Sequence, residues 1–442
     1  MIVLGRKWIG RGILGIVFGL EIVLAGSGVG ARTVWREMAT PHFRVIFPET
    51  MRESAQKVAD IAEELLPQVE AFLQAHLDFQ PAIVLSGDSD IPEGYTDPLR
   101  GAIHLTIAQP YEILSNGTAF GEWVRMVLAH ELTHLVHLGA VGENLEWLRS
   151  LLGYVVLPNV IQPFWVWEGY AMYGEGMLTG RGVKNPFYAM VLRTQALSGG
   201  LLPHYLLRGY SFSRKWPGRL NVYIYGASLI EYIAQAFGEE KLAELSRRRS
   251  ESISLFGFDR AVQDTLGISV EELWNRWRET VENQAYDDLK RVTAAGLSPV
   301  TECTSEGYAT GGVALSPDGL HLVYALSHPD FRPGLRWKDL RTGEKELLVR
   351  GSIIGRPVFS PDGEKLVYAK IARDRKTSYG DLYLYDLKRK KEQRLTVRER
   401  AFSPVFWGEK ILFLRRNRFP EGVFALDVES GVIQPVFEFD QD

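Results

Sequence analysis

Hydrophobic residues recur with two different periods along this chain, and they divide it into two regions. From about residue 40 to residue 285, residues 43–47 alternate between apolar and polar positions, whereas residues 53–77 repeat their apolar positions every three or four residues. Alternation predicts a strand, and the longer period predicts a helix. A strand is also predicted at residues 83–85, and helices at residues 118–138, 165–175, 241–248 and 270–281. The first region is therefore expected to have an α+β fold.

The second region, residues 298–442, consists of short strands separated by turns. Ser-Pro-Asp-Gly occurs at residues 316–319 and again 44 residues later, at residues 360–363, and Ser403-Pro404 follows after 43 more. Each is followed by a predicted strand, and a repeat of about 40–50 residues is typical of propeller blades. These repeats resemble TolB-like β-propeller blades. The region is therefore predicted to be an all-β partial propeller of about three blades.

Three blades are fewer than the four to eight of closed propellers. An open arc exposes the edges of its sheets, which proteins normally cover. The alternatives are a chain shorter than its relatives, an arc that packs against the first region, and an open propeller edge that binds another subunit or protein partner. The basic run at residues 388–391 is interpreted as a solvated turn between strands.

Residues 130–134 read His-Glu-Leu-Thr-His, which is the HExxH pattern of zinc peptidases. On a helix, residues four apart share one face, so His130 and His134 can bind the same ion. Glu131 is rotated away from that face, within reach of a metal-bound water. The apolar residues of this helix lie on its other side, at Val124, Leu128, Leu132 and Leu135. The competing interpretation is a pair of ordinary histidines on a helix surface.

A third ligand follows in a second predicted helix, where residues 165–171 read Trp-Val-Trp-Glu-Gly-Tyr-Ala. A catalytic zinc uses three protein ligands and keeps one open position, and two histidines with one glutamate are an established set. His130, His134 and Glu168 are therefore predicted to hold one Zn²⁺ ion.

HELTH followed by WxxEGxA resembles the gluzincin metallopeptidases, and residues 222–227 (Val-Tyr-Ile-Tyr-Gly-Ala) are similar to the family's tyrosine segment. The resemblance implies a thermolysin/aminopeptidase-like zinc peptidase domain over residues 32–292. It implies that Glu131 is the general base that activates the zinc-bound water, and that Tyr223 stabilises the tetrahedral intermediate. Tyr225 is the rival for that role. The structural alternative for Tyr223 is a core aromatic on an amphipathic helix.

The chain departs from the classical aminopeptidases in two respects. The gap between His134 and Glu168 is longer, and the Gly-x-Met-x-Asn strand that anchors a substrate amino terminus is absent. Residues 100–107 are the candidate for the corresponding edge strand, without an acidic anchor. Exopeptidase action is therefore unsupported, and the expectation is an endopeptidase-like or unknown preference.

Two further titratable residues lie near the motifs. A metzincin would need glycine and histidine where this chain has His137 and Ala140, so that class is excluded. His137 is expected to be a partly exposed or ligand-supporting histidine. Glu175 lies two helical turns, about 10.8 Å, beyond Glu168, too far to bind the same ion. It is expected to be solvated, or at most to orient a ligand.

The N-terminal segment, the net charge and the cysteine count bear on where the protein is located. Three basic residues precede an apolar run at residues 12–25, and residues 29–31 form a cleavage site, so residues 1–31 are predicted to be a signal peptide. Glu21 is atypical, and a retained membrane anchor is the alternative. Cleavage would change the net charge from −4 to about −6, with no basic patch for nucleic acid. Cys303 is the only cysteine, which excludes an intramolecular disulfide and fits bacterial-type export to the periplasm or medium.

The leading hypothesis is an exported zinc metallopeptidase that acts on peptide or protein substrates. A second hypothesis is a non-catalytic scaffold or binding protein that works through its propeller-like repeats. A third is hydrolysis of a non-peptide amide or an epoxide by the same fold.

Overall fold

The computed structural model of this chain describes residues 33–108, 120–209, 215–306, 309–328, 330–374, 377–416 and 421–439. The predicted signal peptide or membrane anchor, residues 1–31, lies outside the described residues. Within the described part of the chain, no helix is both long enough and apolar enough to cross a membrane.

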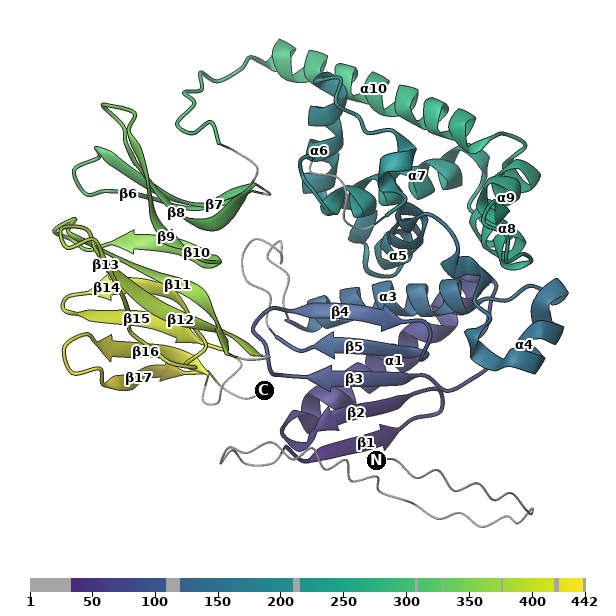
Figure 1. The fold of residues 1–442 in the computed structure, drawn as a ribbon, viewed down its shortest axis with the longest axis horizontal. Helices are drawn as coiled ribbons and strands as arrows, with labels where there is room; N and C mark the ends of the chain where they lie inside the picture. The colour runs from purple at the N-terminus through teal and green to yellow at the C-terminus, as the bar shows by residue number, and fades with distance from the viewer. Residues whose placement is uncertain are drawn as a thin grey trace, which may run out of the picture. The chain divides into compact units, whose positions relative to one another are not determined.

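The first region contains a five-stranded sheet in the order β1-β2-β3-β5-β4. Its strands are β1 (Trp35–Ala39), β2 (Arg44–Pro48), β3 (Ala82–Ser86), β4 (Glu93–Asp97) and β5 (Ala102–Thr106). The strands β2, β3 and β5 run parallel to one another, and β1 and β4 are antiparallel to their neighbours. The sheet is therefore mixed, with an antiparallel strand at each edge (Figure 1).

The prediction that residues 100–107 form the edge strand is wrong, because β5 lies between β3 and β4. Composition explains the order. The apolar side chains of Ile103 and Leu105 on β5 are buried, whereas β4 reads Glu-Gly-Tyr-Thr-Asp and buries none of its residues. The more apolar strand of this hairpin takes the inner position, and the polar strand forms the edge.

Helices cover the sheet and form the rest of the region. They are α1 (Arg52–Leu73), α3 (Phe120–Gly139), α4 (Glu146–Leu152), α5 (Phe164–Thr179), α6 (Pro186–Leu197), α7 (Leu220–Phe237), α8 (Glu240–Ser250), α9 (Gly257–Leu266) and α10 (Val270–Ala295). The helices α1 and α3 pack against each other and against the sheet (Figure 1). One apolar core runs from the sheet through α1, α3, α5 and α7 to α10.

The last helix, α10, runs well beyond the predicted end at residue 281. Its buried residues are confined to its first half, apart from Ala285. Ion pairs four residues apart, Arg276 with Glu272 and Arg278 with Glu282, stabilise the exposed surface of the helix. The apolar period of the sequence therefore predicts the half of α10 that packs on the core, and it misses the solvent-exposed half that follows.

Two glycines allow α5 and α7 to cross at backbone contact. A Cβ atom on Gly226 would lie 2.2 Å from the carbonyl oxygen of Trp165, and one on Gly169 would lie 2.6 Å from the carbonyl oxygen of Gly226. Gly169 directly follows Glu168, and Gly226 directly follows Tyr225. The glycines of the two sequence motifs therefore form one helix-packing contact.

The second region contains three antiparallel four-stranded sheets, each with its strands in chain order. The first holds β6 (Ala309–Leu315), β7 (His321–His328), β8 (Phe331–Asp339) and β9 (Lys345–Arg350). The second holds β10 (Ile353–Phe359), β11 (Lys365–Asp374), β12 (Thr377–Asp386) and β13 (Lys391–Arg394). The third holds β14 (Ala401–Trp407), β15 (Lys410–Arg415), β16 (Gly422–Asp427) and β17 (Ile433–Glu438). Each first strand pairs with the second through an irregular register at an equivalent place. This repetition is consistent with three propeller blades.

The two Ser-Pro-Asp-Gly segments form the same turn after the first strand of their sheets. The Ser316 hydroxyl donates to Asp318 Oδ1 at 2.5 Å, and the Ser360 hydroxyl donates to Asp362 Oδ1 at the same distance. The glycine of each turn has a φ of +72°.

The prediction that Ser403-Pro404 is the third copy of this turn is wrong. These residues lie inside β14, at its register shift, where β10 carries Pro357. The turn after β14 is instead built around Gly408, which has a φ of +61°. Ser403-Pro404 therefore occupies a position within the first strand of its sheet, whereas the other two Ser-Pro pairs lie in the turn after that strand.

The outer two sheets carry exposed apolar side chains. Leu315 on the first sheet is 55% exposed, and Trp407 and Phe437 on the third are 59% and 60% exposed. A partner at the open propeller edge stays a prediction. Residues 388–391 lie at the exposed connection from β12 to β13, as predicted, and Lys390 forms an ion pair with Glu346.

Gly226→Ala tests the crossing of α5 and α7. The added methyl group meets backbone that cannot move alone, and such overpacking costs up to about 3 kcal/mol. This exceeds the gain of about 1 kcal/mol that alanine has over glycine within a helix. We expect a lower free energy of unfolding in urea titrations. Gly200→Ala is the control, because its nearest contact is the Ser198 hydroxyl at 3.2 Å; equal stability of both variants would contradict the packing role.

Candidate metal centre

Two helices supply the predicted ligands. The helix α3 buries Leu128, Leu132 and Leu135 in the core. His130 and His134 project from another side, with their ring centroids 4.8 Å apart. The amphipathic pattern of α3 therefore orients both imidazoles away from its buried apolar stripe.

Glu168 reaches these imidazoles because α5 crosses α3 closely. A Cβ atom on Gly174 of α5 would lie 2.4 Å from the Thr133 hydroxyl of α3. That hydroxyl donates to the Ala129 carbonyl oxygen at 2.7 Å, which turns it back along its own helix. The small residue at the crossing allows the carboxylate of Glu168, about 1.7 turns earlier on α5, to meet the histidines.

The three side chains converge on one point. Glu168 Oε2 lies 3.3 Å from His130 Nε2 and 3.3 Å from His134 Nε2. One ligand atom from each residue lies within 4.8 Å of the others. Zinc bonds of about 2.0–2.1 Å in a tetrahedral site separate neighbouring ligand atoms by about 3.3 Å. The two carboxylate–imidazole distances therefore match the spacing that zinc requires.

The polar atoms of the cluster also fit a cation. Glu168 Oε2 and His134 Nδ1 are buried, and neither has a hydrogen-bond partner among the described residues. Burial alone would raise the pKa of Glu168, but the imidazoles of His134 and His130 lower it to about 2. The carboxylate is thus ionised at neutral pH, which is the state that binds a metal ion.

Charge balance supports the same conclusion. Burial would lower the pKa of His130, yet the carboxylates of Glu168, Glu175 and Glu131 raise it well above its usual range. Several carboxylates in one buried site require a compensating positive charge. A divalent cation bound to Glu168 and the neutral imidazoles would supply that charge, so the residues fit the ion.

The sequence predicts that Glu175 is solvated, or at most orients a ligand. The structure shows that it is not solvated, because the residue is only 6% exposed. Its Oε2 lies 3.2 Å from His130 Nδ1, the ring nitrogen that points away from Glu168. Glu168 and Glu175 are two turns apart on α5, as expected, but α3 crosses α5 between them and places His130 beside Glu175. Glu175 therefore orients His130, as carboxylates behind ligating histidines commonly do.

Glu131 is held by the edge strand of the sheet. The Thr96 hydroxyl on β4 lies 2.7 Å from Glu131 Oε2 and 3.0 Å from the Glu131 carbonyl oxygen. A Cβ atom on Gly94 would lie 3.1 Å from Glu131 Oε1, so β4 passes directly over this carboxylate. Thr96 and Gly94 are site residues that the sequence analysis missed, because no spacing relates them to a helix that begins more than twenty residues later.

The two candidate tyrosines have different surroundings. Tyr225 is fully buried, and its hydroxyl donates to Gln195 Oε1 at 2.6 Å and accepts from the Leu202 amide at 2.9 Å. These bonds occupy it within the core. The ring of Tyr223 lies 6.2 Å from the ring of His130, at the metal cluster. Of the two tyrosines, Tyr223 is therefore the one whose ring lies beside the cluster, and its oxyanion role stays a prediction.

His137 is neither partly exposed nor a support for a metal ligand; it belongs to the core. It is 1% exposed and stacks on Tyr170 with the ring centroids 4.1 Å apart. Its two ring nitrogens contact Ser246 Oγ at 2.9 Å and Gln162 Nε2 at 2.7 Å. Burial lowers the pKa of His137 to about 3, so the imidazole is neutral in the folded protein.

No known protein family and no curated protein matches this sequence. Solved structures resemble part of it. TolB from Acinetobacter baumannii matches with 20% identity and a TM-score of 0.25 over 29% of this chain and 32% of its own. A putative TolB from Agrobacterium tumefaciens matches with 20% identity and a TM-score of 0.28 over 31% and 49%. The β-propeller domain of the Trilobed protease from Pyrococcus furiosus matches with 17% identity and a TM-score of 0.23 over 28% and 41%.

The matched part spans less than half of each of these proteins, and TM-scores of this size support no conclusion about activity. The propeller-like character of the three C-terminal sheets rests on their own strand order and on their repeated register shifts.

Replacing Glu175 tests its role behind His130. Glu175→Gln keeps the size of the side chain but removes the charge that orients and polarises the imidazole. We expect zinc affinity to fall by about 10–100-fold, measured by competition with a chelator of known affinity. Glu244→Gln is the matched control, because Glu244 on α8 is a partly exposed carboxylate that pairs with Lys241. Unchanged zinc affinity in Glu175→Gln would show that the contact is incidental.

Protonation of His137 predicts a specific pH dependence of stability. The unfolded imidazole binds a proton below about pH 6.5, whereas the folded one does so only below about 3. The stability contributed by neutral His137 is present above pH 6.5 and is lost as the pH falls from 6.5 towards 3, by about 1.4 kcal/mol per pH unit. We expect His137→Phe to be less stable than the wild type at pH 7 and to lose this part of the pH slope.

Urea unfolding at pH 7, 6, 5 and 4 measures the slope. His76→Phe is the control, because His76 lies on the surface and its side chain is 81% exposed. Parallel curves for the wild type and His137→Phe would contradict the buried neutral state.

Proposed function

We propose that this chain is a zinc-dependent peptidase of the gluzincin type, with His130, His134 and Glu168 as metal ligands. The observation that supports this most strongly is the approach of one buried carboxylate oxygen to two imidazole nitrogens at zinc-ligand spacing. A second carboxylate, Glu131, lies beside that cluster without being part of it. A purely structural zinc site has no use for this additional group.

The chemistry divides between the ion and the protein. A zinc ion in this site would polarise the scissile carbonyl and lower the pKa of the attacking water. Glu131 accepts a proton from that water and delivers it to the leaving amine. The Thr96 hydroxyl holds Oε2 of Glu131, so the carboxylate keeps one orientation through both proton transfers.

The edge strand β4 is suited to hold an extended substrate. Within the described residues it pairs only with β5, so its other edge offers unpaired backbone groups. An extended peptide can add to such an edge by main-chain hydrogen bonds. Because Thr96 belongs to β4 and contacts Glu131, a peptide bound there would lie next to the general base.

Tyr223 is the proposed donor to the developing oxyanion. A preorganised donor of this kind typically contributes about 3–4 kcal/mol to transition-state stabilisation. Its ring lies beside His130, whereas the hydroxyl of Tyr225 is engaged with Gln195. An endopeptidase-like mode is favoured over exopeptidase action, since the chain lacks the motif that would anchor a substrate amino terminus.

Glu131→Gln tests the assignment. The amide cannot accept the proton, so we expect cleavage of a mixed peptide library to fall by about 10²–10⁴-fold, as is typical when a general base is lost. Zinc content should stay at one ion per chain. Mass spectrometry of the digest measures activity and cleavage mode together, with and without a chelator, and metal analysis measures the zinc.

Glu143→Gln, in the exposed segment after α3, is the matched control and should keep full activity. Full turnover by Glu131→Gln would refute the proposed role. A wild-type chain that holds zinc but cleaves no peptide of the library would favour the scaffold hypothesis or a non-peptide substrate.

A further inference from the structure

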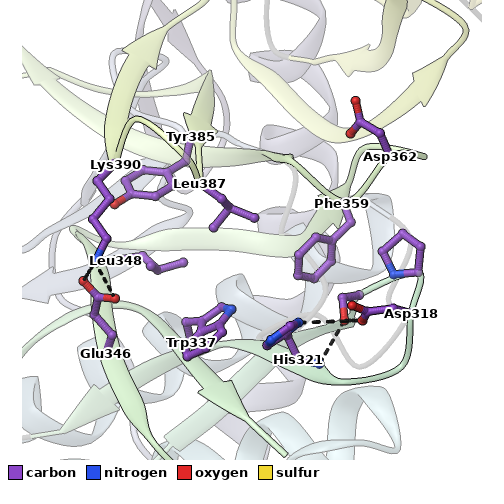
Figure 2. Close-up of a pocket in the computed structure, with 13 residues that line it drawn as sticks. Asp318, His321, Trp337, Glu346, Leu348, Phe359, Asp362, Tyr385, Leu387 and Lys390 are labelled. Atoms are coloured by element: carbon purple, nitrogen blue, oxygen red, sulfur yellow. Dashed lines mark hydrogen bonds and ion pairs between the residues drawn. The ribbon is translucent and has the colours of Figure 1, made fainter.

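A cavity of about 480 Å³ lies between the first and second C-terminal sheets, apart from the residues of the metal centre (Figure 2). Volumes of this size are typical of small-ligand sites. One wall comes from β7, β8 and β9 of the first sheet, and the other comes from β10, β12 and the turns that follow them. The cavity therefore opens in the seam between two adjacent blades.

Aromatic rings form the apolar part of this cavity. Trp337, Phe359 and Tyr385 surround it from both sheets, as Figure 2 shows. The ring of His321 stacks on Trp337, with the centroids 4.8 Å apart and an interplanar angle of 24°. The same rings belong to the core that joins the two sheets, so the packing holds them in place. Such faces attract flat or cationic groups through their π electrons.

The charged groups of the cavity are not balanced. Lys390 Nζ lies 2.9 and 3.1 Å from the two carboxylate oxygens of Glu346, so these two charges neutralise each other. The other acidic residues that line the cavity are Asp318 and Asp362. Hydrogen bonds from serine hydroxyls keep the pKa of both below the usual range, so both are ionised at neutral pH.

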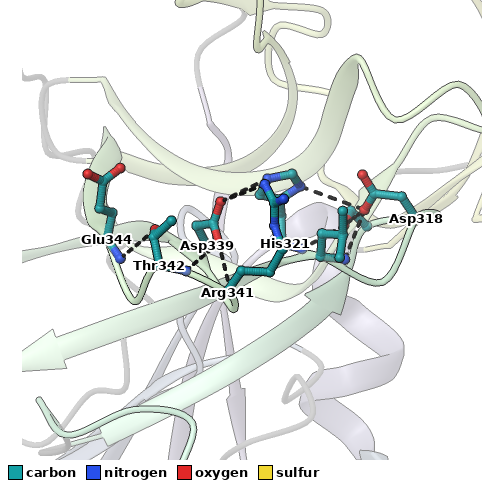
Figure 3. A network of polar contacts seen from close by, with 8 residues as sticks. Asp318, His321, Asp339, Arg341, Thr342 and Glu344 are labelled. Carbon is teal, nitrogen blue, oxygen red and sulfur yellow. Dashed lines mark hydrogen bonds and ion pairs between the residues drawn. The ribbon is translucent and has the colours of Figure 1, made fainter.

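Few positively charged side chains lie close to the carboxylates of Asp318 and Asp362. Asp362 has no ion-pair contact among the described residues, although the charges of Lys365 and Lys388 act on it from farther away. His321 lies 3.7 Å from Asp318 on one side and 3.7 Å from Asp339 on the other, so one imidazole is shared between two carboxylates (Figure 3). The cavity therefore carries a net negative charge.

The repeated turn brings Asp318 and Asp362 to the same rim. Each accepts a serine hydroxyl and a following backbone amide through Oδ1, from Leu320 at 2.9 Å and from Glu364 at 2.9 Å. A Cβ atom on Gly363 would lie 3.4 Å from Pro317, so the two turns are side by side. Each carboxylate is thus fixed by its own turn, and both turns belong to the residues that line the aromatic pocket.

We propose that this cavity binds a positively charged side chain, the guanidinium or ammonium group of an arginine or lysine in a peptide segment of a partner. The apolar stem of such a side chain fits against the rings, and the cation approaches both the ring faces and the two carboxylates. An anionic ligand would meet net negative charge. A neutral sugar could stack on the rings but would leave the carboxylates uncompensated.

The test uses the full-length chain and small probes without a peptide bond, so that the proposed peptidase activity cannot interfere. Butylguanidinium and butylammonium represent the two side chains, and butylurea is the neutral isostere. We expect saturable binding of one or both cations by calorimetry or ligand-observed NMR, at least tenfold tighter than butylurea. Added salt should weaken it.

Variants locate the binding. Asp318→Asn combined with Asp362→Asn keeps the oxygen that each turn uses, and we expect it to weaken cation binding at least tenfold. Trp337→Leu should weaken it as well. Asp427→Asn is the matched control, because Asp427 accepts the Ser430 hydroxyl in a turn of the third sheet. Unfolding midpoints establish that each variant is folded.

Three outcomes would overturn the proposal. The first is no saturable binding of either cation to the wild-type chain. The second is equal binding of butylurea, or of a neutral disaccharide such as cellobiose, which would assign the cavity to an uncharged ligand. The third is an equal loss in the Asp427→Asn control, which would reduce the effect to general surface charge.

Discussion

The close crossing of three helices is the constraint on which the candidate metal centre depends. Gly174 sets the distance between α5 and α3, while Gly169 and Gly226 set the distance between α5 and α7. At both crossings a side chain would occupy space that backbone or Thr133 already fills. The carboxylate of Glu168 reaches the imidazoles because α5 is held at these distances on both sides. The glycine of each motif is therefore explained by helix packing.

Burial of charge is the second consequence of this packing. The helices that bring Glu168 to the histidines also bury Glu131 and Glu175, so three carboxylates surround His130 at low solvent exposure. Such a group is stable only with positive charge nearby. His137, one turn beyond His134, shows the contrast. It is more deeply buried than His130 and its hydrogen-bond partners are neutral, and its pKa is lowered where that of His130 is raised.

The sequence predicted the residues that lie on periodic elements better than the residues that meet across them. The spacing within α3 was enough to pair His130 with His134. It could not show that α3 crosses α5 between Glu168 and Glu175, and this crossing gives Glu175 a histidine partner in place of solvent. The strand order of β4 and β5 was missed for a similar reason, since a hairpin can pair with β3 through either strand. Ser403-Pro404 misled because a dipeptide repeat does not define its position within a blade.

The contact between Thr96 and Glu131 connects the two layers of the first region. The carboxylate of Glu131 belongs to helix α3, and the Thr96 hydroxyl on a strand of the sheet holds it. That strand is the edge strand, and its side without a strand partner among the described residues is the one to which an extended peptide would add. Movement of β4 on binding such a peptide would be passed directly to Oε2 of Glu131. Under the proposed function, substrate binding and orientation of the base would then depend on the same strand.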